Sequence, residues 1–95
     1  MTCTAARDLA AYWGAYAASK AALEAVVRIY ARELGVTKAT ANLVDPGVMG
    51  TALRLRAFPG EDRAKLPAPE TRTETFVALA EARSARNGEL VSAVA

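Results

Sequence analysis

The sequence predicts an α/β fold in which two parallel strands are joined through helices. A long helical pattern covers residues 13–34, where apolar side chains recur every three or four positions. Two short strand patterns, 39–47 and 89–94, are separated by further helical segments. Strands separated in this way pair in parallel through a right-handed crossover. Because a parallel pair is normally buried on both faces, these strands are expected to belong to a larger sheet.

The long helix dominates the first third of the chain. Residues 1–12 before it show no periodicity and are predicted to be a loop or extended entry. Gly35 is typical of a helix C-cap, and Glu24 and Arg28 are spaced as a stabilising i,i+4 pair. One face of the helix allows another backbone to approach closely, because it consists of alanines: Ala17, Ala18, Ala21, Ala22 and Ala25.

The middle of the chain reads as a strand, a short helix and a loop. The strand over 39–47 ends at an Asp-Pro-Gly turn, residues 45–47. Residues 51–57 favour a short helix. Proline and glycine recur in residues 58–69, so this segment is predicted to be a surface loop.

The last quarter of the chain repeats the alternation of helix and strand. A helix is predicted over 70–84, where Thr71 and Glu74 have the spacing of a capping box. An Asn-Gly turn at 87–88 precedes the final strand over 89–94.

Composition excludes several classes of function. Twelve basic and ten acidic residues give a net charge of +2, and the arginines are scattered, so no nucleic-acid partner is expected. The chain has no histidine and a single cysteine, Cys3, which excludes the usual zinc sites and histidine-dependent nucleophiles. No apolar run approaches the roughly 18 residues of a membrane span. Without a signal-peptide pattern at the start, a cytoplasmic protein with no membrane partner is predicted.

Tyr16 and Lys20 are the residues whose spacing suggests chemistry. Side chains four apart on a helix lie one above the other. An ammonium near a phenol lowers the phenol pKa from its ordinary value of about 10. Such a tyrosine can exchange a proton with a carbonyl or an alcohol. The alternative is an amphipathic tyrosine and a lysine extended along the helix rim, and the spacing alone leaves both open.

The context of this pair resembles the short-chain dehydrogenase/reductase family. WGAYAASKAALEAVVRIYARELG, residues 13–35, contains Tyr16-x-x-x-Lys20, and ATANLVDPGVMGTAL, residues 39–53, follows it. The stretch is most similar to uncharacterised bacterial oxidoreductases of that family. The resemblance implies the C-terminal part of a Rossmann-type doubly wound fold. Residues 1–95 are therefore predicted to form one partial domain, the C-terminal third, without the nucleotide-binding first half.

The resemblance also implies an NAD(P)-dependent oxidoreductase that acts on a small carbonyl or alcohol. Tyr16 would be the catalytic acid/base, and Lys20 would lower its pKa and bind the nicotinamide ribose. Cys3 stands where the family has a serine that polarises the substrate carbonyl, and a thiol is a weaker donor. Residues 52–69 would form the substrate loop. The cofactor would also contact four residues after the first strand: Pro46, Gly47, Val48 and Thr51.

Two further expectations concern the chain as a whole. It contains no G-x-G-x-x-G fingerprint, so the isolated 95 residues are expected to be inactive, with the choice between NAD and NADP left open. The alternative function is a catalytically incompetent fragment or remnant that acts as a dimerising or interaction module. The family resemblance implies a homo-oligomer formed through the helix over 13–34. Ser19 is expected to be structural, and Trp13, Tyr12 and Tyr30 to make core or subunit contacts.

Overall fold

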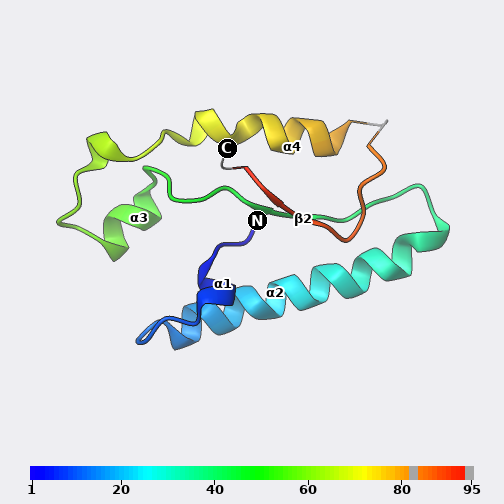
Figure 1. Ribbon diagram of the computed structural model, residues 1–95, viewed down its shortest axis with the longest axis horizontal. Helices are drawn as coiled ribbons and strands as arrows, with labels where there is room; N and C mark the ends of the chain where they lie inside the picture. Colours follow the sequence, from blue (N-terminus) through cyan, green and yellow to red (C-terminus); the bar gives the residue numbers. More distant parts are fainter. Residues whose placement is uncertain (82–83, 94–95) are drawn as a thin grey trace.

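Helices lie on both sides of a short parallel sheet in the computed structural model, which describes residues 1–81 and 84–93 (Figure 1). Strands β1 (Leu43–Asp45) and β2 (Leu90–Ser92) pair in parallel, in the register Leu43 opposite Leu90. Helix α2 (Gly14–Glu33) runs along one side of the strands, and α4 (Thr73–Ala80) runs along the other. The predicted α/β class, with a long helix and a parallel strand pair, is confirmed.

Helix α2 forms because its sequence is rich in alanine, the strongest helix former. Its predicted extent is nearly right, but its predicted end at a Gly35 C-cap is wrong. The C-cap is Leu34, and a 3-10 helix, Leu34–Val36, continues through Gly35. The backbone N–H and the hydroxyl of Thr37 both donate to the Leu34 carbonyl over 2.8 Å, which holds this extra turn.

The prediction of a loop or extended segment over the first twelve residues is incomplete. These residues also contain the one-turn helix α1 (Ala5–Asp8). The Thr4 carbonyl accepts hydrogen bonds from the N–H groups of Arg7 and Asp8, both over 2.9 Å. A single turn is too short to produce a visible apolar period. Leu9 follows it in the left-handed conformation at φ 54°, and the chain turns so that α1 packs against α2.

Both strands are shorter than the sequence predicts. Strand β1 covers only 43–45 of the predicted 39–47, and it ends before Pro46, which has no N–H to donate to a ladder. Strand β2 covers 90–92 of the predicted 89–94, and residue 94 lies outside the described residues. The predicted turn at 87–88 is present: Gly88 has φ 71°, and its N–H donates to the Ala41 carbonyl over 2.8 Å.

Helix α3 (Ala52–Ala57) confirms the predicted short helix and begins at Thr51, whose Oγ1 accepts from the N–H of Arg54 over 3.3 Å. The loop that follows contains a 3-10 helix, Arg63–Lys65. Asp62 caps this turn by accepting from the N–H of Ala64 over 3.0 Å.

Helix α4 is shorter than the predicted helix over 70–84, of which residues 82–83 lie outside the described residues. A 3-10 helix, Pro69–Arg72, takes the place of its first turn. The predicted capping box is not formed, because the Thr71 hydroxyl donates to the Ala68 carbonyl over 2.6 Å instead.

The apolar core of the described residues is thin. Leu43 is the largest fully buried side chain. The radius of gyration is 14.9 Å, against about 12 Å for a compact domain of this length. None of the helices in residues 1–81 and 84–93 is long and apolar enough to cross a membrane. The buried apolar residues are few and mostly small: Ala6, Ala17, Ala31, Leu43 and Val44.

Candidate active site

Cys3 and Tyr16 meet in the space between the N-terminal segment and α2. The Cys3 thiol donates to the Tyr16 phenol oxygen, with Sγ and Oη 3.7 Å apart. Cys3 comes just before α1, and the packing of α1 against α2 brings it to the tyrosine. The residue at the predicted serine position therefore does contact the predicted acid/base.

Lys20 lies one turn after Tyr16 on the same stripe of α2. Its Nζ is 5.8 Å from the centroid of the Tyr16 ring, at the edge of the range for a cation–π contact. Ser19, between them, donates to the Tyr16 carbonyl over 2.7 Å. This local backbone contact supports the structural role predicted for Ser19.

The pKa of Tyr16 lies above its ordinary value of 10.0. The main cause is the hydrogen bond with Cys3, followed by burial of the phenol and by the charge of the Cys3 thiolate. Lys20 was expected to lower this pKa, but the structure shows the opposite direction. The Cys3 sulfur is 3.7 Å from the phenol oxygen itself, whereas the Lys20 ammonium is 5.8 Å from the centroid of the ring. Tyr16 is consequently a protonated phenol at neutral pH.

Arg7 connects the three segments that carry the predicted site residues. Its guanidinium donates to Glu24 of α2 over 2.7 Å and to Asp45 of β1 over 2.6 Å. Thr2 donates to the same Glu24 oxygen over 2.5 Å. The predicted pair of Glu24 with Arg28 is wrong, because this carboxylate is buried against Arg7 and Thr2.

The loop after β1 is held by groups on both sides of it. Gly47 has φ 74°, a left-handed conformation that favours glycine, and its N–H donates to Asp45 Oδ1 over 3.0 Å. The buried Pro46 offers its carbonyl to Arg72 Nε over 3.1 Å. Val48, in contrast, is 47% exposed. Thr51 is fixed as the N-cap of α3, as the sequence predicts.

Three aromatic rings pack together at the N-terminal end of α2. The Trp13 and Phe58 rings lie nearly parallel, at 20°, with centroids 5.7 Å apart. Trp13 also meets the Tyr16 ring edge-on, with centroids 5.8 Å apart. Trp13 was expected to make core or subunit contacts, and here it contacts the loop after α3.

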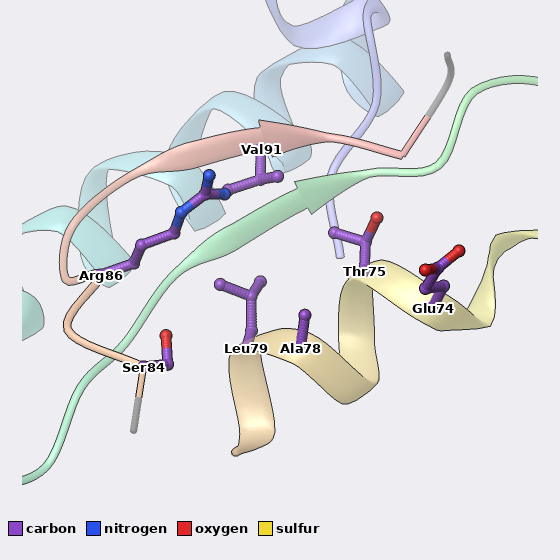
Figure 2. Close-up of a pocket in the computed structure, with 7 residues that line it drawn as sticks. All are labelled: Glu74, Thr75, Ala78, Leu79, Ser84, Arg86 and Val91. Carbon is purple, nitrogen blue, oxygen red and sulfur yellow. The ribbon is translucent and has the colours of Figure 1, made fainter. Parts of the chain in front are cut away.

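Two surface hollows lie away from the predicted catalytic and cofactor-binding residues, and the second borders the predicted substrate loop. Figure 2 shows the first, a cavity of about 390 Å³ between α4 and β2 that includes Leu79, Arg86 and Val91 in its wall. The second, of about 540 Å³, lies beside Gly50 and the segment of residues 63–70. Neither is lined by a predicted catalytic or cofactor-binding residue. The candidate site is therefore defined by the contacts around Tyr16.

The structure joins the predicted residues in two groups. Cys3, Tyr16 and Lys20 form one group, and the loop residues 46–51 form the other. Among residues 1–81 and 84–93, no hydrogen bond or ion pair joins Tyr16 or Lys20 directly to that loop. The connection runs through Arg7, which sequence reasoning missed. The available signal was Glu24, which continues the i,i+4 row of Tyr16 and Lys20.

Comparison with known proteins gives the family. The family model described as enoyl-(acyl carrier protein) reductase matches residues 1–82. The uncharacterized oxidoreductase YciK of Escherichia coli K12 is 46% identical over 59 residues, which are 62% of this chain and 23% of that protein. The matched part is thus less than a quarter of that relative.

Solved structures agree over nearly the whole chain. A short-chain dehydrogenase from Salmonella enterica serovar Typhi CT18 superposes with a TM-score of 0.91 at 30% identity, over 99% of this chain and 39% of that one. A short-chain dehydrogenase from E. coli CFT073, complexed with NADPH, gives 0.90 at 33% identity over the same shares. With the family model matching most of its residues, the chain belongs to the short-chain dehydrogenase/reductase family of oxidoreductases.

Proposed function

We propose that these 95 residues supply the proton-transfer part of an NADPH-dependent carbonyl reductase, with Tyr16 as the acid. The observation that carries the proposal is the Tyr16 phenol, contacted by Cys3 at 3.7 Å and followed one turn later by Lys20. A phenol whose pKa is not lowered from its ordinary value is protonated at neutral pH, and the pKa of Tyr16 is raised. A protonated phenol can donate to the oxygen of a carbonyl substrate, which is the direction of reduction.

The residues suit one half of a nicotinamide cofactor. Lys20 and the Thr51 hydroxyl can donate hydrogen bonds to a ribose and to a carboxamide, and the exposed Val48 offers an apolar contact. The backbone at Pro46 and Gly47 is fixed by Arg72 and Asp45, so these groups are pre-oriented. When bound, the cofactor supplies the hydride. We choose NADPH because a family member 33% identical to this chain is complexed with it.

The remaining part of the cofactor needs groups that this sequence does not contain. The pyrophosphate of a dinucleotide is bound by a glycine-rich turn, and no G-x-G-x-x-G occurs in the 95 residues. The chain spans 39% of the two dehydrogenase structures. We therefore expect the isolated chain to bind NADPH weakly and to show no turnover.

The proposal is tested in a chimera in which residues 1–95 replace the matching part of the Salmonella dehydrogenase. Tyr16→Phe should lower NADPH-dependent reduction of a panel of small aldehydes and ketones by about 100-fold or more, because general acid catalysis contributes roughly 10²–10⁴. Tyr12→Phe is the matched control, since Tyr12 is fully exposed. Equal rates for the two variants would rule out the role given to Tyr16.

A second candidate function is an interaction module that has lost catalysis. It is favoured by the apolar outer face of α2, where Val26 is 64% and Ile29 58% exposed. A second copy of the chain could cover this face, and the alanines beside it would allow close approach. Sedimentation of the 95-residue chain should then show a dimer that dissociates on dilution. A monomer at every concentration, together with an active chimera, would remove this candidate.

A further inference from the structure

Trp13 and Phe58 form a contact between two segments 45 positions apart in the sequence (58 − 13). Trp13 is the N-cap of α2, and Phe58 is the C-cap of α3. Their rings are nearly parallel, and a centroid distance of 5.7 Å lies within the range of offset stacking. Tyr16 lies three residues after Trp13 and meets its edge at 5.8 Å, so the stack reaches the phenol of the candidate site.

Phe58 also contacts a residue of its own segment. The Arg54 guanidinium lies 3.9 Å from the Phe58 centroid, which is a close cation–π contact. Two hydrogen bonds of 2.8 Å from Arg54 to Glu61 fix the guanidinium in that position. Arg54, Phe58 and Glu61 thus form a preassembled unit, which we call the loop clamp.

The loop clamp is tied to the rest of the molecule mainly through the indole. The described hydrogen bonds and ion pairs of residues 52–62 join them to one another or to neighbours within 51–66. The ring contact with Trp13 is the one that reaches α2. A loop that is ordered internally, and whose described polar and ring contacts reach α2 through this one aromatic pair, can dock and undock as a unit.

We infer that Trp13 is a positioning residue: its indole is the platform on which the loop clamp docks, and docking holds residues 52–62 beside Tyr16. This rests on the proposed function in one respect, namely that the segment forms part of the substrate site. The role differs from the core or subunit contact that the sequence suggested for Trp13. It makes Phe58 the residue that couples loop position to the geometry around the phenol.

Fluorescence gives a direct readout in the 95-residue chain, because Trp13 is its only tryptophan. Phe58→Leu removes the stack but keeps an apolar side chain. It should shift Trp13 emission to the red and increase quenching by acrylamide. An aromatic pair of ordinary strength corresponds to a fall of about 2- to 12-fold in the docked-to-undocked ratio.

Two further variants make this experiment decisive. Phe76→Leu, in the exposed face of α4, is the matched control and should leave emission and quenching unchanged. Arg54→Ala keeps Phe58 but removes its cation–π partner, so it should change quenching in the same direction by a smaller amount. If far-UV circular dichroism shows that Phe58→Leu has lost helix, the quenching of Trp13 in Arg54→Ala becomes the test of docking. Unchanged quenching in a folded variant would overturn the inference.

The chimera separates this inference from the proposed function. Phe58→Leu should raise KM for the carbonyl substrate while leaving KM for NADPH unchanged, since the ring contacts of Phe58 are with Trp13 and Arg54, neither of which is a predicted cofactor residue. Trp13→Phe keeps a ring for stacking and should retain most of the affinity that Trp13→Ala loses. Equal substrate KM values in these two Trp13 variants would contradict a stacking role. If Tyr16→Phe is fully active but quenching responds to Phe58→Leu, the docking stands and only the catalytic proposal fails.

Discussion

The Cys3 sulfur lies 3.7 Å from the Tyr16 phenol oxygen, and a charged sulfur there accepts a hydrogen bond from the phenol O–H and stabilises the protonated phenol. Its hydrogen bond is the largest cause of the raised Tyr16 pKa. A raised phenol pKa keeps the proton in place as the pH rises, although it also makes the phenol a weaker acid. The reverse reaction needs a phenolate to accept a proton from an alcohol, so alcohol oxidation should require a more alkaline solution than reduction.

Removing the thiol should lower the pKa of Tyr16. In Cys3→Ala the hydrogen bond and the nearby thiolate are both lost, and burial remains as the only raising cause. The measurement is a titration of phenolate absorbance, in which the difference from a Tyr16→Phe partner isolates this one tyrosine. Thr4→Ala, an exposed neighbour, is the control. A Tyr16 titration midpoint unchanged by Cys3→Ala would show that the thiol does not control the phenol.

At the scale of elements, Arg7 fixes α1, α2 and β1 relative to one another. It is one cation between two carboxylates whose side chains are only 7% and 8% exposed. Buried carboxylates are costly when left without a partner, which makes the guanidinium necessary for this arrangement. The same Asp45 also accepts from the N–H of Gly47, so the position of the loop after β1 depends on the ion pair.

Arg7→Met should therefore destabilise the chain much more than a surface substitution. The expected loss is about 2 kcal/mol in the free energy of unfolding, below the usual range for a fully buried pair because Arg7 is 37% exposed. Urea unfolding measures it. Arg28→Met, on the exposed side of α2, is the matched control and should change stability by less than about 0.5 kcal/mol. Equal losses in the two variants would mean that the ion pair does not hold the elements together.

At the scale of the whole molecule, layered secondary structure is combined with little apolar burial. Helices lie on both sides of the strands, yet Leu43 is the largest side chain that is fully buried (Figure 1). Small domains bury a modest fraction of their surface, and this chain is also more extended than a compact domain of its length. Its stability consequently depends on a few residues around β1.

Leu43→Ala should unfold most of the chain. Replacing a buried leucine by alanine costs about 2–5 kcal/mol, which approaches the whole stability of a small domain. Leu53→Ala is the matched control, because Leu53 is 62% exposed on α3. Circular dichroism should show a loss of helix in the first variant and not in the second. Retention of the full signal in Leu43→Ala would mean that the core lies elsewhere.

How far the sequence predicts this protein depends on the range of the contacts involved. The extent of α2 and the N-cap at Thr51 follow from local propensity and local hydrogen bonds, and the turn at Gly88 follows from the local preference of glycine for positive φ. The ends of the strands and of α4 were predicted less well. The strand ends depend on which distant residues pair and on the missing N–H of Pro46. The start of α4 depends on whether the Thr71 hydroxyl caps the turn that contains Glu74 or donates back to the Ala68 carbonyl.

The sequence by itself determined the family, the α/β class and the positions of Cys3, Tyr16 and Lys20, because these are written in residue types at fixed spacing. Only the tertiary structure decided what surrounds them. It brought Cys3 to the phenol and so reversed the expected direction of the Tyr16 pKa shift. It also paired Glu24 with Arg7 in place of the predicted surface partner Arg28. It also placed Phe58 on Trp13. The physical reason is that hydrogen bonding, ion pairing and ring stacking depend on distances in space between residues that the sequence keeps far apart.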